Sequence, residues 1–188
     1  MRSAGEALGV KTVVWEDPSD PAPLAATAPD VACVAAFGVL LSPQVLAVPR
    51  VDFLNVHPSL LPRHRGGAPV PATILAGDQE TGVTIHRTVE ALDAGPAVLS
   101  RRTEVGDRET AGELLARLGG LGGECLDAAL GAIEKGTAAF TEQDQAQATE
   151  CSRLVKDDGR VRWPASATQV DRQIRAVTPW PGARTSLG

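Results

Sequence analysis

Aromatic residues are scarce in this chain, which has no tyrosine and only three phenylalanines and three tryptophans in 188 residues. Proteins that hold single-stranded nucleic acid stack its bases on aromatic rings, so this composition argues against such a platform. Positive charge is not in excess either, because the formal net charge is −5. DNA-binding proteins usually carry a basic surface, and the sequence therefore predicts no DNA partner. One short basic stretch, residues 63–65, can still contact phosphates.

Cysteine is also scarce, and the three that occur, Cys33, Cys125 and Cys151, form no CxxC pair and are odd in number. That pattern favours buried free thiols over a disulfide framework or a zinc site. No apolar stretch reaches the roughly 18 residues that span a membrane. The residues after Met1 do not follow the charged-then-apolar pattern of a signal peptide. The sequence predicts a cytoplasmic protein that needs neither a membrane nor a metal.

Strand and helix patterns alternate along the chain, which indicates an α/β fold. The apolar run Val31–Phe37 is typical of a buried parallel strand. A capping box at Thr110 predicts the start of the longest helix. Glycines at 119–120 and 122–123 each weaken that helix by about 1 kcal/mol relative to alanine, and indicate either close packing or a break. The other predicted elements are a short helix after Ser42-Pro43, a strand over 52–56, a helix over 69–76, and strands over 83–88 and 97–105.

The pattern changes after Gly136 to a connection rich in threonine, alanine and glutamine, with short strands. A second capping box at Ser166 predicts a helix with Val170, Ile174 and Val177 on one face. We therefore divide the chain into a principal domain, residues 1–136, and a second region, residues 137–188, that contains a linker and the start of a C-terminal part.

Two polar residues stand at the end of a predicted strand, where open α/β sheets place their ligands. Asn55 and His57 are two positions apart, so their side chains lie on the same face of the strand. Pro58 then ends the strand. Further along, Asp93 precedes Gly95 in a predicted loop and adds a carboxylate that can orient the imidazole. An amide donor, a proton carrier and a tuning carboxylate together suit acyl transfer through an oxyanion.

Each of these residues has a simpler interpretation when it is taken alone. Asn55 would be a turn residue, and His57 would be a hydrogen-bonded histidine of the core. Ser59 could be a nucleophile beside a histidine, but it lacks the G-x-S-x-G pattern of hydrolases. His64 and His86 have no partner at a recognisable spacing, and we interpret both as structural.

The order of several motifs decides between these interpretations. Asn55-x-His57 is followed by Ser59-Leu60-Leu61-Pro62, by Arg-Gly-Gly-Ala-Pro at 65–69, by the run 76–85, by Asp93-x-Gly95, and near the end by Ile174-Arg175-Ala176-x-x-Pro179-Trp180-Pro181. In this order and spacing, from about Leu8 to Pro181, the chain resembles the folate-dependent formyltransferases, and among them the methionyl-tRNA formyltransferases. The glycinamide ribonucleotide branch shares Asn-x-His and the distant aspartate but not the Pro-Trp-Pro tail.

The resemblance implies a formyltransferase-type, Rossmann-like fold with a mostly parallel sheet and a small C-terminal extension. Residues 1–136 would be the catalytic domain. Nothing before Leu8 matches the first strand and the Gly-Thr-Pro turn of the family, and the chain ends soon after Trp180, before the family's tRNA-binding β-barrel domain. The expectation is therefore a catalytic domain that lacks its first strands and its accessory domain.

The resemblance also implies a reaction, the transfer of a formyl group from 10-formyltetrahydrofolate to the amino group of initiator methionyl-tRNA. Asn55, His57 and Asp93 would be catalytic: Asn55 and a protonated His57 would donate hydrogen bonds to the oxyanion, and Asp93 would favour the imidazolium. The folate site would be lined by Ser59, Leu60, Leu61 and Pro62. Two alternatives remain open. One is a different amine acceptor, such as glycinamide ribonucleotide or an amino sugar, and the other is an inactive fragment that only binds folate.

Overall fold

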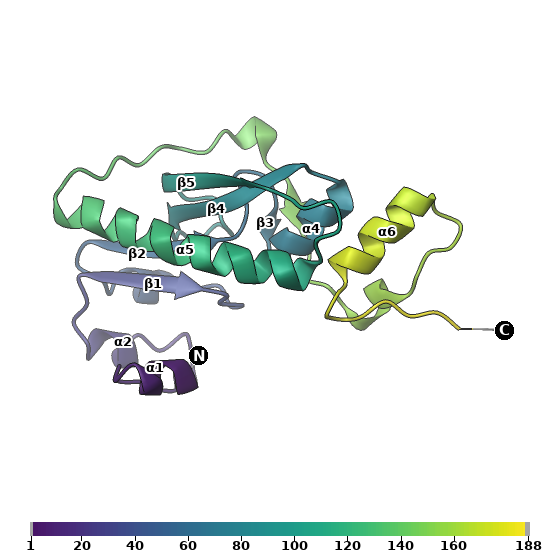
Figure 1. The fold of residues 1–188 in the computed structure, drawn as a ribbon. Helices are drawn as coiled ribbons and strands as arrows, with labels where there is room; N and C mark the ends of the chain where they lie inside the picture. Colours follow the sequence, from purple (N-terminus) through teal and green to yellow (C-terminus); the bar gives the residue numbers. More distant parts are fainter. Residues whose placement is uncertain (1, 187–188) are drawn as a thin grey trace.

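The structure, a computed structural model, describes residues 2–186 and is built around a four-stranded sheet (Figure 1). The strands lie in the order β1 (Val31–Ala35), β2 (Asp52–His57), β4 (Glu80–Arg87) and β5 (Ala97–Glu104). β1 is parallel to β2, whereas β4 runs antiparallel to both β2 and β5. The predicted α/β class is confirmed. The prediction of a mostly parallel sheet is wrong, because the described sheet is mixed.

The two connections around β4 explain the antiparallel strands. Helix α4 (Pro69–Ala76) lies beyond the end of the sheet at which β2 finishes, so the chain enters β4 from that end and runs back beside β2 (Figure 1). Residues 88–96 then join β4 to β5. That connection is shorter than the dozen or more residues that a parallel crossover needs, so β5 has to return antiparallel to β4.

Helix α5 (Ala111–Glu134) packs against the sheet and forms the main core (Figure 1). Its first turn carries the predicted capping box, in which Thr110 Oγ1 accepts from the Glu113 N–H and the Glu113 carboxylate accepts from the Thr110 N–H. The buried face of the helix follows the helical period and includes Leu114, Leu118, Cys125 and Ala129. It packs against Leu54 of β2 and against Val83 and Ile85 of β4.

The glycines of α5 do not break the helix, which continues through all of them. Gly122 is buried against the sheet, and a Cβ atom built on it would lie 2.9 Å from Val56 Cγ1. Gly123 faces open space, with nothing within 4 Å of its Cβ position. Of the two possibilities that the sequence left open, close packing is confirmed at Gly122, because the absent side chain lets the helix approach the sheet.

Opposite effects on stability are expected from substitutions at these two neighbouring glycines. Gly122→Val should lower the free energy of unfolding by about 1–3 kcal/mol, because it overpacks the contact with Val56. Gly123→Ala should raise it by about 0.5–1 kcal/mol, because alanine has the higher helix propensity and meets no neighbour. Urea denaturation of the two variants measures both changes. Equal effects at the two positions would contradict this account of the packing.

Shorter segments cover the opposite face of β1 and β2. They include α2 (Ala22–Ala25) and α3 (Pro43–Leu46), and a second cluster is buried there, made of Ala32, Leu41, Val45 and Phe53. Helix α1 (Arg2–Ala7) precedes these segments in the chain. α3 begins as predicted, with Pro43 in its first turn and with Ser42 Oγ accepting from the Val45 N–H at 3.4 Å.

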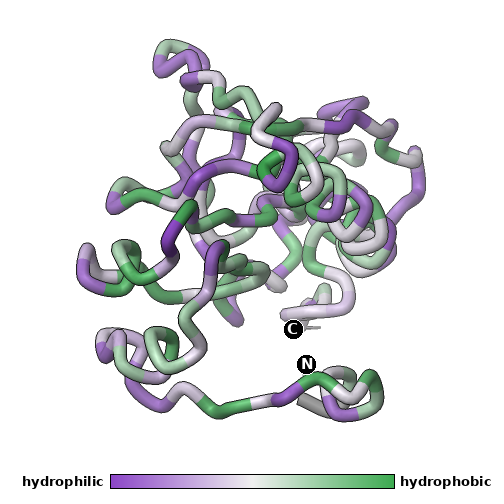
Figure 2. Tube along the Cα trace, turned by 90° about the vertical axis from the view of Figure 1, so that its left-hand side faces the viewer, coloured by the Kyte–Doolittle hydropathy of each residue, from purple (hydrophilic) through white to green (hydrophobic). Residues whose placement is uncertain are grey.

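The N-terminal side of the molecule leaves apolar side chains exposed. Leu8, Val10, Val13 and Val14 are all exposed, and Figure 2 shows this hydrophobic stretch running apart from the body of the molecule. Cys33 is exposed on β1, which is an edge strand, whereas Cys125 is buried and Cys151 is half-buried. The expectation of buried thiols is therefore wrong for Cys33, because its side chain lies at the edge of the sheet and is not covered there.

The C-terminal part packs on α4 through helix α6 (Ala167–Ala176). Its capping box at Ser166 is confirmed, but its buried face is Gln173, Ala176 and Val177, while Ile174 is exposed. The Gln173 amide donates to the carbonyl oxygens of Asp158 and Arg160, which is why a polar residue replaces the predicted apolar one.

The remaining short elements are β3 (Arg65–Gly66), η1 (Gln145–Gln147), β6 (Glu150–Cys151) and η2 (Lys156–Gly159), with β3 parallel to β6. Between residues 2 and 186, no helix is long and apolar enough to cross a membrane.

Candidate active site

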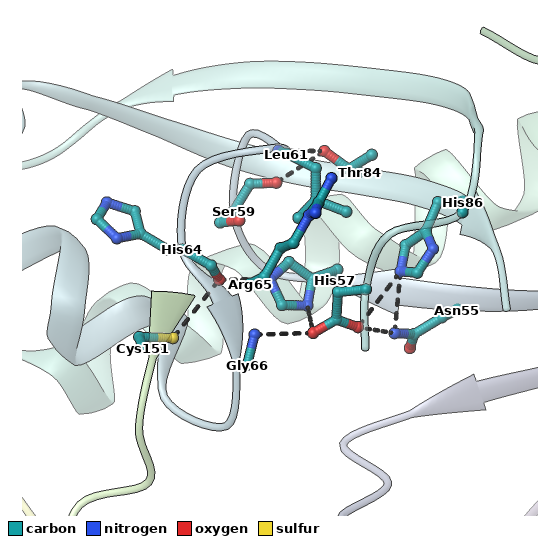
Figure 3. A network of polar contacts seen from close by, with 12 residues as sticks. Asn55, His57, Ser59, Leu61, His64, Arg65, Gly66, Thr84, His86 and Cys151 are labelled. Atoms are coloured by element: carbon teal, nitrogen blue, oxygen red, sulfur yellow. Dashed lines mark hydrogen bonds and ion pairs between the residues drawn. The ribbon is translucent and has the colours of Figure 1, made fainter. Parts of the chain in front are cut away.

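The three predicted catalytic residues converge at one end of the sheet. Figure 3 labels Asn55 and His57. Asn55 and His57 leave the same face of β2, and Asp93 lies in the connection between β4 and β5. Asn55 Nδ2 donates to Asp93 Oδ1 at 3.1 Å, and His57 Nδ1 lies 3.5 Å from Asp93 Oδ2. Their convergence is confirmed, while their catalytic roles stay a prediction.

Hydrogen bonds hold Asp93 both at its carboxylate and at its main chain. Gly66 donates its N–H to Asp93 Oδ2 at 2.9 Å. The Gln143 side chain donates to the carbonyl oxygens of Asp93 at 2.8 Å and of Gly95 at 2.7 Å, and its Oε1 accepts from the buried guanidinium of Arg65. Sequence reasoning missed Gln143, because it lies 50 residues beyond Asp93 and no local pattern marks it.

Arg65 is therefore not available for phosphates, because it is buried and bonded to Gln143. The other two members of the basic stretch are engaged as well, since the side chains of Arg63 and His64 both pair with Asp78, at 2.8 and 2.7 Å. A neighbouring carboxylate and a buried amide thus engage all three side chains, but that of Arg63 is 48% exposed, and a phosphate contact there stays a prediction.

His86 belongs to the site, although the sequence analysis interpreted it as structural. Its Nε2 lies 3.1 Å from Asn55 Nδ2 and 3.6 Å from Asp93 Oδ1 (Figure 3). Its Nδ1 lies 2.9 Å from the Arg87 carbonyl oxygen. His86 reaches the site because β4 pairs with β2 in the register that places His86 opposite Asn55. That register is a property of the sheet, and no spacing along the chain indicates it.

His57 is almost fully buried, at 3% exposure. Its Nε2 lies 2.9 Å from the carbonyl oxygen of His64, an acceptor only, so Nε2 carries the proton. Burial lowers the pKa of His57, and the opposing influence of Asp93 and of the His64 carbonyl does not restore it. In the free site desolvation thus outweighs the attraction of Asp93, while a protonated His57 at the oxyanion stays a prediction.

The burial of His57 predicts a pH dependence of stability. The pKa of His57 in the folded chain is lowered from 6.5, so the unfolded chain binds the proton more readily. As the pH falls below 6.5, the wild type should lose stability relative to His57→Gln, and at higher pH the difference should be constant. Chemical denaturation of both proteins between pH 5 and pH 8 measures this difference. A difference that grows in the opposite direction would show that the folded state prefers the imidazolium.

At Asp93, in contrast to His57, the neighbouring groups outweigh the effect of burial on the pKa. Burial raises the pKa of its carboxyl group, but the nearby His86 and His57 rings and the Gly66 N–H outweigh burial, so the pKa lies below its usual value. The site therefore holds a carboxylate beside two imidazole rings.

A cavity of about 750 Å³ opens in front of these residues, a size typical of sites for small-molecule ligands. Asn55, His57 and Asp93 stand at its wall, and most of the remaining lining is apolar or backbone: residues 36–40, 66–71, 111–112 and 178–180, with Leu92, Leu115, Arg153 and Leu154. The Arg153 side chain donates to the carbonyl oxygen of Gly38, and both residues line the cavity.

The predicted folate residues, Ser59 to Pro62, follow the lining residue Pro58 in the chain but do not themselves line this cavity. Ser59 is fully buried and its hydroxyl donates to the Arg63 carbonyl oxygen at 2.6 Å, so it is not a nucleophile aimed at the cavity. The Leu61 N–H donates to Thr84 Oγ1 at 3.1 Å, and that hydroxyl donates to the Ser59 carbonyl oxygen at 2.8 Å. The segment Ser59–Pro62 is therefore tied to β4, and its contact with folate stays a prediction.

Comparison with known proteins adds to this geometry. A family model described as "Formyl transferase" matches residues 17–130. The chain belongs to the formyl transferase family. A second model, described as "Formyl transferase, C-terminal domain", matches residues 153–188. The chain is 45% identical over 166 residues to the methionyl-tRNA formyltransferase of Anaeromyxobacter dehalogenans, which is 88% of this chain and 53% of that protein. The chain thus spans about half the length of the curated relatives it matches.

Solved structures share the formyl transferase fold. A sugar N-formyltransferase from a Shewanella species has a TM-score of 0.79 at 16% identity, covering 97% of this chain and 74% of that one. HypX from Aquifex aeolicus, solved with tetrahydrofolic acid, has a TM-score of 0.76 at 21% identity, covering 90% of this chain and 30% of that one. At these identities the likeness shows the fold alone.

Proposed function

We propose that this chain carries the machinery that transfers a formyl group from 10-formyltetrahydrofolate to the amino group of initiator methionyl-tRNA. The identity of 45% to a methionyl-tRNA formyltransferase is the observation that carries the proposed acceptor. The convergence of Asn55, His57 and Asp93 at a cavity supports the proposed chemistry. The cytoplasmic location expected from the sequence stays a prediction.

The formyl donor is proposed to occupy the cavity. HypX, a protein of the same fold, was solved with tetrahydrofolic acid, and the cavity of about 750 Å³ has room for a ligand of that class. Apolar walls at Phe37, Leu92 and Leu115 suit an aromatic ring system, and exposed backbone at 66–68 offers hydrogen-bonding groups. The formyl carbon would then lie at the end where Asn55, His57 and Asp93 meet.

In the proposed reaction the acceptor amine attacks the formyl carbon, and the bond between that carbon and N10 breaks. The amine loses one proton and N10 gains one. The Asp93 carboxylate and the unprotonated Nδ1 of His57 both face the reacting point and can take the amine proton, directly or through a water. No metal is needed for these steps.

The oxyanion that forms during the attack needs hydrogen-bond donors. In the resting structure the Asn55 amide nitrogen lies 3.1 Å from His86 Nε2 and 3.1 Å from Asp93 Oδ1. One of its N–H groups has to turn from these partners to the oxyanion when the substrate is bound. Loss of a single donor of this kind typically raises the barrier by about 3–4 kcal/mol.

An acceptor-competition assay tests the proposal. The protein as produced from its own gene is given 10-formyltetrahydrofolate with methionyl-tRNA, glycinamide ribonucleotide or an amino-sugar nucleotide, and the formylated product is measured. Formylation of methionyl-tRNA at a kcat/KM at least about 100-fold above the other two, a discrimination of about 2.7 kcal/mol, is expected. Preference for another acceptor would overturn the proposed substrate. Folate binding without any transfer would favour the inactive alternative.

A further inference from the structure

Three electron-pair donors of the active site face one point. They are His57 Nδ1, His86 Nε2 and the Asp93 carboxylate, and one ligand atom from each lies within 4.8 Å of the others. His57 Nδ1 is 3.5 Å from one carboxylate oxygen, and His86 Nε2 is 3.6 Å from the other. A tetrahedral zinc ion with ligands at about 2.0–2.1 Å keeps its ligand atoms about 3.3–3.4 Å apart. Both histidine-to-carboxylate distances are therefore within a few tenths of an ångström of chelating spacing, and the two imidazole nitrogens lie within 4.8 Å of each other.

The protonation of both imidazoles suits a metal. His57 Nε2 and His86 Nδ1 each lie 2.9 Å from a backbone carbonyl oxygen, of His64 and Arg87 respectively. A carbonyl oxygen only accepts hydrogen bonds, so each of these nitrogens carries the proton. In the neutral rings, the opposite nitrogens then present lone pairs toward Asp93. A backbone carbonyl that holds the far N–H is the usual outer partner of a metal-binding histidine.

The remaining neighbour, Asn55, can complete the set. Its amide nitrogen lies between His86 Nε2 and Asp93 Oδ1, at 3.1 Å from each. An N–H group there supplies positive charge to a point that is otherwise surrounded by lone pairs. If the amide turns about its Cβ–Cγ bond, its oxygen takes that place and offers a fourth ligand atom. The cavity in front of Asn55, His57 and Asp93 gives an ion a path from solvent.

We propose that His57, His86 and Asp93 bind Zn²⁺, or a similar first-row transition metal, and that the bound ion blocks the active site. Two imidazole nitrogens and one carboxylate are a ligand set for such ions rather than for Mg²⁺ or Ca²⁺. The ion occupies the atoms that would take the amine proton, so it competes with the reaction instead of assisting it. This second part rests on the proposed function, whereas the binding itself does not.

Nuclear magnetic resonance of the histidine rings tests the binding directly, because the chain has only three histidines. Titration of the whole chain with ZnCl₂ should shift the ring nitrogens of His57 and His86. The ring of His64 should not move, since it pairs with Asp78 outside the set. We expect a Kd of about 10 µM or tighter. No shift at about tenfold higher Zn²⁺, or shifts confined to His64, would overturn the proposal.

Matched histidine variants locate the ion. His86→Gln should weaken Zn²⁺ binding by more than about 100-fold, because even outer partners contribute 10- to 100-fold. His64→Gln should leave the Kd unchanged. Asp93→Asn should weaken binding as His86→Gln does, and it replaces that variant if circular dichroism shows that His86→Gln is unfolded. Equal Kd values for His86→Gln, Asp93→Asn and the wild type, in folded proteins, would overturn the site.

Cobalt distinguishes this site from the thiols, of which Cys33 is exposed. Co²⁺ bound by imidazole and carboxylate should give tetrahedral visible bands without the intense near-ultraviolet band of a cobalt–thiolate bond, and such a band would assign the ion to a cysteine instead. In the transfer assay, Zn²⁺ should inhibit and a chelator should restore the rate. Zinc binding without inhibition would leave the metal site standing and overturn only the competition.

Discussion

Replacement of Asp93 by asparagine is expected to lower the rate of formyl transfer about 10²- to 10⁴-fold, the range of a lost acid–base group. Asparagine keeps the size of the side chain and an oxygen that can accept from the Gly66 N–H, so the loop should hold its shape. The negative charge and the proton acceptor beside His57 are lost. Steady-state kinetics should show the loss in kcat more than in KM, because the missing interaction acts on the transition state.

A double variant checks that Asp93 and His57 act as one unit. His57→Ala combined with Asp93→Asn should cost little more than either change alone, because residues that work together give strongly non-additive losses. Asp127→Asn, an exposed aspartate on α5, serves as the matched control and should leave the rate unchanged. Strictly multiplicative losses would argue that the two residues act independently.

Gly66→Ala is expected to lower the free energy of unfolding by about 2–4 kcal/mol and to reduce activity as well. Gly66 has φ of 118°, a conformation that side chains rarely adopt, and a Cβ atom built there would lie 2.1 Å from the Cys151 carbonyl oxygen. This clash would disturb the pairing of β3 with β6. It would also displace the Gly66 N–H, which donates to the Asp93 carboxylate. The two losses should therefore appear together in one variant.

Urea denaturation and the transfer assay measure these two losses. Gly123→Ala is the matched control, because it adds the same methyl group where nothing lies within 4 Å. The control should keep full activity. A Gly66→Ala protein with wild-type stability would show that the β3–β6 pair can move apart without cost, and wild-type activity would show that the Gly66 N–H does not position Asp93.

Several elements of the fold were predictable because their causes are local. The helices that begin after Ser42, Thr110 and Ser166 start where the sequence places a capping side chain, since a cap acts within three residues. Strand directions were not predictable in the same way. The direction of β4 depends on α4 lying beyond the end of the sheet, and that position is set by its packing against α5 and α6.

The residues of the candidate site also differ in whether the sequence could predict them. The shared face of Asn55 and His57 follows from the alternation of side chains along one strand, whereas Asp93 was singled out by the resemblance to the formyltransferases. His86 could not be predicted, because only the pairing of β2 with β4 places it opposite Asn55. Gln143 could not be predicted either, since its partners Asp93 and Gly95 come from a distant loop.

The sequence by itself determined the α/β class, the helix starts and the residues that could perform acyl transfer, because these depend on composition, periodicity and short motifs. Only the tertiary structure decided the mixed sheet, the entry of His86 into the site and the lowered pKa of His57. Each of these depends on which distant segments come into contact. The lowered pKa of His57 is the clearest case, because desolvation by the surrounding chain outweighs the attraction of the Asp93 carboxylate.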